Sequence, residues 1–70
     1  MGTLRENLEY IKEHSQIWPY ICIGTPGHWT EGSSVDSVIA MMGESVLDRD
    51  VADIRVYGLK MMLVVQLAEE

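Results

Sequence analysis

The chain has a single cysteine, no phenylalanine, few basic residues and no apolar run long enough to cross a bilayer. Because Cys22 is alone, no internal disulfide can form, and the paired-cysteine spacings of zinc sites are absent. Small secreted domains usually depend on disulfides, so we expect a cytoplasmic protein. Charged residues begin at Arg5 with no apolar leader segment after them, which agrees with that expectation.

Basic residues are scarce: five Lys and Arg oppose eleven Asp and Glu, for a formal charge of −6. Nucleic-acid binding requires clustered Lys and Arg, and anionic membranes attract basic surfaces. The charge therefore predicts no direct nucleic-acid partner and no membrane partner. It favours a protein partner that is itself basic or binds nucleic acid.

Five methionines stand in for the missing phenylalanines, and 47% of the residues are apolar. That fraction is typical of a folded protein, and 70 residues suffice for one small core. We expect residues 1–70 to form a single small α+β domain. Because methionine is an adaptable side chain, some of the five are expected at a contact surface.

A capping-box sequence opens the chain, with Thr3 able to accept from the Glu6 amide and Glu6 able to reach back. Leu4, Leu8 and Ile11 then recur on one helical stripe. These features predict an amphipathic first helix that lies on a sheet.

Residues 17–23 predict a strand, with Pro19 placing it at a sheet edge or delaying its pairing. Pro26 and Gly27 suit the centre of a type II turn. Residues 28–31 then form either a returning strand or a loop; we favour the strand, because an unstructured loop would be long here.

A second helix is predicted after Ser33 or Ser34, either of which can cap it. Gly43 either ends this helix early or weakens it. Residues 53–67 predict a hairpin in which Gly58 supplies a positive φ. The apolar positions that recur at helical spacing are Val35, Val38, Ile39, Met42 and Val46.

The predicted fold is α+β, with two helices packed on one face of a three- or four-stranded sheet, in the order α-β-(β)-α-β-β. Aliphatic positions choose the helix-covered side: Ile17, Ile21, Ile23, Ile54 and Val56. Alternation sends the other set to the uncovered side: Trp18, Tyr20, Cys22, Arg55, Tyr57, and either Met62 with Val64 or their odd-numbered neighbours.

An uncovered face rich in aromatics, Met and Arg has the composition of an interface core. We therefore predict a small acidic protein-interaction module that uses this face for a homodimer or a foreign target. His28 and Trp29, beside the turn, are a second contact candidate, although Trp29 could instead cap the core edge. The predicted partner-binding residues are Trp18, Tyr20, Arg55, Tyr57, Met62, Val64, His28 and Trp29.

In size, charge and predicted element order the whole chain resembles the small acidic α+β proteins that phages and mobile elements use to inhibit host enzymes, such as anti-CRISPR proteins or polymerase inhibitors. No sequence motif carries this resemblance. It implies that acids face a basic groove in place of nucleic acid: Glu31, Asp36, Glu44, Asp48, Asp50 and Asp53. The alternative is a homodimeric structural or accessory protein.

Catalysis would require Cys22, His28 and the acids Glu31 or Asp36 to meet. Because Cys22 lies in an apolar strand, we expect no catalytic activity. No second His or Cys stands at metal spacing from His14, so no metal or cofactor is predicted. A base-stacking sheet is the remaining alternative, in which Trp18, Tyr20 and Tyr57 would act with Arg55 and Lys60.

Overall fold

The computed structural model describes residues 1–69 and contains two helices and a four-stranded mixed sheet. The elements follow the predicted α-β-β-α-β-β order, which confirms the α+β fold and the strand at residues 28–31. Their bounds are α1 (Leu4–Ser15), β1 (Tyr20–Thr25), β2 (His28–Gly32), α2 (Val35–Met42), η1 (Glu44–Asp48), β3 (Val51–Tyr57), η2 (Gly58–Lys60) and β4 (Met62–Leu67), where η marks a short 3-10 helix.

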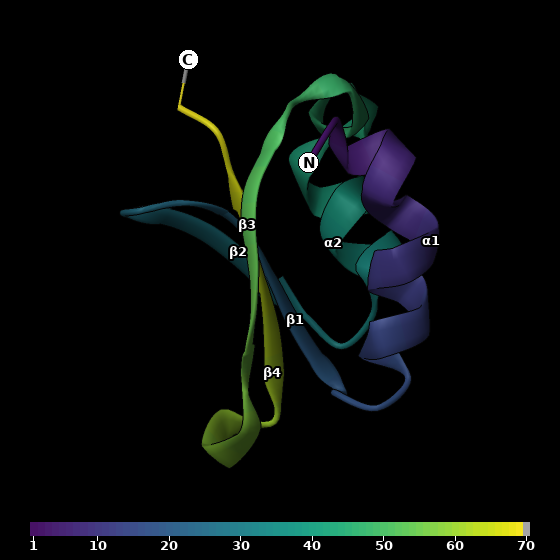
Figure 1. Ribbon diagram of the computed structural model, residues 1–70, viewed down its shortest axis with the longest axis vertical. Coiled ribbons are helices and arrows are strands. Elements are labelled where there is room, and N and C mark those ends of the chain that lie inside the picture. The colour runs from purple at the N-terminus through teal and green to yellow at the C-terminus, as the bar shows by residue number, and fades with distance from the viewer. Residues whose placement is uncertain (70) are drawn as a thin grey trace.

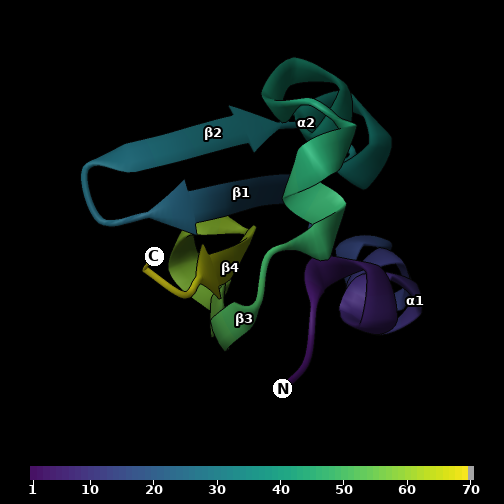
Figure 2. The ribbon, with the colours of Figure 1, turned by 90° about the horizontal axis from the view of Figure 1, so that it is seen from above.

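The strands lie in the order β2-β1-β4-β3. The two central strands, β1 and β4, run parallel, and each pairs antiparallel with its own hairpin partner at the edge. Figure 1 shows α1 and α2 together on one side of this sheet, and Figure 2 shows the same two layers from above. We call the side without helices the outer face.

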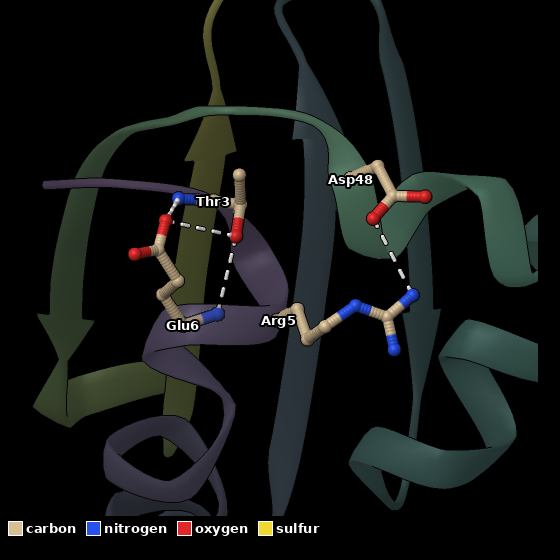
Figure 3. A network of polar contacts seen from close by, with 4 residues as sticks. All are labelled: Thr3, Arg5, Glu6 and Asp48. Atoms are coloured by element: carbon tan, nitrogen blue, oxygen red, sulfur yellow. Dashed lines mark hydrogen bonds and ion pairs between the residues drawn. The ribbon is translucent and has the colours of Figure 1, made fainter.

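Polar contacts at the first turn of α1 hold this helix in place. The Thr3 hydroxyl accepts from the Glu6 N–H at 3.2 Å, and the Glu6 carboxylate accepts from the Thr3 N–H at 2.9 Å (Figure 3). Arg5 pairs with Asp48 at 3.4 Å and so links α1 to η1. Both predicted halves of the capping box are thus present.

The second helix ends where glycine permits it. Ser34 caps α2 by accepting from the Ser37 N–H at 3.1 Å, and Gly43 follows the last helical residue with φ 94°. Gly43 therefore ends the helix, which settles the two alternatives drawn from the sequence. Val46 is buried as its spacing indicated, but it lies in η1 rather than in a continued helix.

The core fills the space between the helices and the inner face of the sheet. Alternation along β1 and β4 sends every second side chain into it, which is why these strands carry the most buried residues. The wholly or almost wholly buried side chains are Leu4, Ile11, Ile21, Ile23, Val38, Leu63, Val65 and Leu67.

Two sequence expectations about the sheet faces are wrong in placement, and a third is wrong in burial. Ile17 is 67% exposed, because β1 begins only after Pro19 and the alternation does not reach back through the turn. Trp18, expected on the outer face, packs against the core instead, and its ring lies beside Gly58. Val56 has the expected inward register but is 44% exposed at the sheet edge.

The β3–β4 hairpin also turns differently from the prediction. Its left-handed residue is Met61 (φ 53°) rather than Gly58. The chain closes through the 3-10 turn η2, in which the Met61 N–H donates to the Gly58 carbonyl at 3.2 Å. In β4 Leu63 points into the core, and Met62 and Val64 take the outer face, as one of the two predicted alternatives had it.

Candidate functional site

The outer face brings together side chains from all four strands. Its central row runs from Glu31 of β2 through Cys22 and Val64 to Arg55 of β3, because each is the register partner of the next. Tyr20, Met62 and Tyr57 form the neighbouring row in the same way. The row beyond the central one holds Trp29, Gly24, Gln66 and Asp53.

Two shallow hollows occupy this face. The larger, about 240 Å³, is lined by Cys22, Trp29, Glu31, Tyr57, Lys60, Met62 and Val64. The smaller, about 150 Å³, is lined by Trp29, Asp53, Arg55, Tyr57, Val64 and Gln66. Trp29, Tyr57 and Val64 line both, so the hollows adjoin, and we call them together the trough.

The β1–β2 hairpin contributes Trp29 to the lining of the trough, and in Figure 1 this hairpin extends away from the helices. The hairpin turns at Gly27, whose φ of 85° suits the predicted Pro-Gly turn. Gly24 lies opposite Trp29, where a Cβ would come within 2.1 Å of the His28 carbonyl oxygen. A side chain at position 24 would thus force the two strands apart.

The floor of the trough is apolar. Cys22 is only 5% exposed, and Val64 and Met62 are half-buried. The pKa of the Cys22 thiol is raised, first by burial and then by the negative charge of Glu31. Both effects disfavour the thiolate, and the buried Cys22 side chain adds to the apolar floor.

Charges stand at the margins of the trough, where they partly compensate one another. The Asp53 carboxylate pairs with the Arg55 guanidinium and also accepts from the Ile54 N–H at 3.0 Å. The hydrogen bond and charge of Asp53 raise the pKa of Arg55, so this side chain stays cationic. Glu31 and Lys60 give the larger hollow one charge of each sign.

Five of the predicted partner-binding residues share the outer face by register: Tyr20, Arg55, Tyr57, Met62 and Val64. Trp29 joins them as a wall of the trough instead of capping the core. Trp18 does not, since it packs against the core. His28 does not either, because strand alternation places it on the opposite face from Trp29.

Sequence reasoning missed the contributions of Glu31, Asp53, Lys60 and Gln66 to the trough. The period-two alternation of β2, counted from the Pro-Gly turn, could have placed Trp29 and Glu31 on one face. No local signal relates Asp53 to Gln66, because their proximity comes from the β3–β4 register with its shift between Val51 and Asp53.

The arrangement does not form the thiol site considered from the sequence. Glu31 lies beside Cys22, but His28 lies three positions before Glu31 in β2 and on the other face. Among residues 1–69, no group of three or more His, Cys, Asp or Glu side chains is placed to hold a metal ion. Neither helix in that range is long and apolar enough to cross a membrane.

The six acids proposed to imitate nucleic acid are divided among several surfaces. Glu31 and Asp53 line the trough. Asp36 pairs with Lys12 at 3.3 Å, and Asp48 pairs with Arg5. Glu44 and Asp50 lie at and just beyond the ends of η1.

Comparison of this chain with family models, with curated proteins and with solved structures found no match.

Proposed function

We propose that this chain is a non-enzymatic protein-interaction module that binds an apolar segment of a protein partner in the trough. One observation carries the proposal: aromatic side chains from both edge strands stand over an apolar floor that the helices leave uncovered. Uncovered apolar surface of this kind is the usual mark of an interaction site in a small protein.

The composition of the outer face supports this function. Tyr20, Trp29 and Tyr57 are 54%, 40% and 44% exposed, so each has surface left to bury. Tyrosine, tryptophan, methionine and arginine are the side chains that dominate interface cores and binding hot spots. The Asp53–Arg55 pair adds a polar margin that can orient a partner.

The net charge of −6 supports a basic partner, because opposite charge accelerates association. A host enzyme with a basic groove, inhibited by this chain, is the form of the proposal that its resemblance to small phage proteins suggests. Since the acids are spread over several surfaces, we assign the specific contacts to the trough and only the steering to the charge.

Affinity capture followed by mass spectrometry tests this function when wild type is compared with Trp29→Ala and Tyr57→Ala. Truncating a hot-spot aromatic costs about 2 kcal/mol, or roughly a thirtyfold loss of affinity. Tyr10→Ala is the matched control, because Tyr10 is 50% exposed on α1 and lies away from the trough. Equal capture by all four proteins would show that the trough is not the binding surface.

A homodimeric accessory protein is the second candidate. The observation that favours it is the β2 edge of the sheet, whose outward backbone groups form no hydrogen bond within the part of the chain that the structure describes.

A further inference from the structure

The two edges of the sheet differ in how they are protected. Unpaired strand edges attract other strands, and natural proteins usually block them. At β3 the N-terminal segment does so: the Val51 N–H donates to the Gly2 carbonyl at 2.8 Å, and Thr3 bridges to Asp50. Figure 2 shows this segment near β3, away from β2.

Farther along β3, a side chain occupies one more outward backbone group. The Ile54 N–H points away from β4, and the Asp53 carboxylate accepts from it at 3.0 Å. A register shift between Val51 and Asp53 makes the strand irregular as well. An added strand would therefore have to displace a segment of the chain or break a side-chain hydrogen bond.

The β2 edge has no comparable protection. Thr25 faces His28 across a two-residue turn, so the backbone groups of these two residues hydrogen-bond to each other. From His28 onward, the residues of β2 alternate between directing their backbone groups to β1 and directing them outward. His28 and Thr30 direct their backbone groups to β1, and Trp29 and Glu31 direct theirs outward. Among residues 1–69, no side chain or terminal segment forms a hydrogen bond with those outward groups.

We propose that β2 pairs antiparallel with β2 of a second copy, which joins the two sheets into one of eight strands about a two-fold axis at Thr30. Homodimers with this symmetry are the commonest oligomers, and each copy supplies the same edge. The proposal concerns the strand edge and does not depend on a foreign partner in the trough.

Three registers would align the outward backbone groups of Trp29 and Glu31 in the two copies, and the side chains of β2 favour the one centred on Thr30. Pairing Glu31 with the second Glu31 would oppose two like charges. Pairing Trp29 with the second Trp29 would leave Glu31 opposite the Gly27 turn and shorten the ladder. Pairing Trp29 with Glu31 uses all five residues, separates the carboxylates and places the two Thr30 side chains together, a favourable cross-strand pair.

The dimer would also extend the candidate site. In this register Trp29 of each copy stands beside Glu31 of the other on the outer face. The two troughs then adjoin across the axis, with both Trp29 side chains at the centre. A partner with two apolar segments could bind both copies at once.

The register makes a disulfide test available. The two Thr30 residues form a pair that is not hydrogen-bonded, with Cα atoms about 4.5 Å apart, which is within the range of a disulfide. Thr30→Cys should therefore form a covalent dimer on mild oxidation. His28→Cys, on the same strand and face, is the matched control, because it lies opposite Gly32 of the second copy. Both variants are made in a Cys22→Ala background.

Sedimentation equilibrium of the unmodified chain gives the second readout. We expect a monomer–dimer equilibrium that tightens with added salt, because two copies of charge −6 repel each other. Glu31→Pro removes an outward N–H but no bond to β1, so it should weaken the dimer at least about tenfold while the circular dichroism stays unchanged.

The outcomes separate cleanly. Faster cross-linking of Thr30→Cys than of His28→Cys, together with a dimer that Glu31→Pro weakens, supports the proposal. A monomer at all concentrations overturns it, as does equal cross-linking of the two variants. A dimer that Trp29→Ala and Tyr57→Ala dissociate but Glu31→Pro leaves intact would assign self-association to the trough and also overturn it.

Discussion

Trp29 and Tyr57 belong to opposite edge strands of the sheet, yet both line the same two hollows on its outer face. Two central strands separate them, and the small or half-buried side chains of those strands let the aromatic rings define a common trough. The trough is thus a property of the whole sheet, and its integrity depends on the hairpins at both edges.

The two faces of β4 should respond differently to truncation. Leu63 is wholly buried, so Leu63→Ala should lower the free energy of unfolding by about 3 kcal/mol. Val64 lies half-buried in the trough, and Val64→Ala should cost about 1 kcal/mol or less. Urea denaturation followed by tryptophan fluorescence measures both. Equal losses would mean that the outer face is covered in solution.

The β1–β2 hairpin should tolerate alanine at one glycine better than at another. A Cβ at Gly27 meets no atom within 4 Å, so Gly27→Ala adds only the strain of its φ, about 1 kcal/mol. A Cβ at Gly24 would overlap the His28 carbonyl, so Gly24→Ala should destabilise the protein clearly more. Thermal unfolding of the two variants compares them, and the reverse ranking would contradict the strand pairing described here.

Cys22 should react slowly with thiol reagents at neutral pH. Burial and the charge of Glu31 both raise its pKa, so little thiolate is present, and access is restricted. Glu31→Gln removes the charge but not the burial and should speed the reaction modestly, while denaturant should speed it strongly. Stopped-flow absorbance with a disulfide reagent follows the rate. Rapid reaction of the folded wild type would show that the floor of the trough is open.

Acid should weaken the start of α1 through Glu6. Hydrogen bonds from the Thr3 backbone and side chain lower the pKa of Glu6 below its usual 4.5. The folded state therefore binds the proton less tightly than the unfolded state, and the stabilisation is present above pH 4.5 and lost as the pH falls through the lowered value.

The matched variant for this effect is Glu6→Gln, whose amide oxygen can still accept from the Thr3 N–H. Its unfolding free energy should fall less than that of wild type on acidification below pH 4.5. Thr3→Ala should cost about 1 kcal/mol at neutral pH, because a helix cap is removed. Identical acid titrations of wild type and Glu6→Gln would show that Glu6 does not contribute.

Much of the core could be predicted from local patterns, because helical spacing alone indicates which residues of a helix are buried. Val38 and Ile39 recur at helical spacing, so their burial could be predicted without knowing the strand order, whereas the alternation of β4 left open whether Leu63 and Val65 or their neighbours are buried. Prediction was wrong where a pattern was extended past its element. The alternation of β1 does not include Ile17 or Trp18, because Pro19 intervenes before the strand begins.

Part of the candidate site was predictable in the same way. Tyr20 and Tyr57 were assigned to the outer face from alternation alone, with Met62 as one of two alternatives, and the register places the three side by side. Glu31 could have been added by counting alternation from the Pro-Gly turn, but Asp53 could not, because its place beside Gln66 depends on the β3–β4 register.

By itself the sequence determined the order of helices and strands and the apolar stripe of each helix, since these properties depend on neighbours a few positions away. Only the tertiary structure decided that β4 enters the sheet between β1 and β3, that Trp29 and Tyr57 share a trough, and that β2 is the edge left unprotected by residues 1–69. The physical reason is that strand order and edge protection are set by hydrogen bonds between distant segments, which leave no local periodicity in the chain.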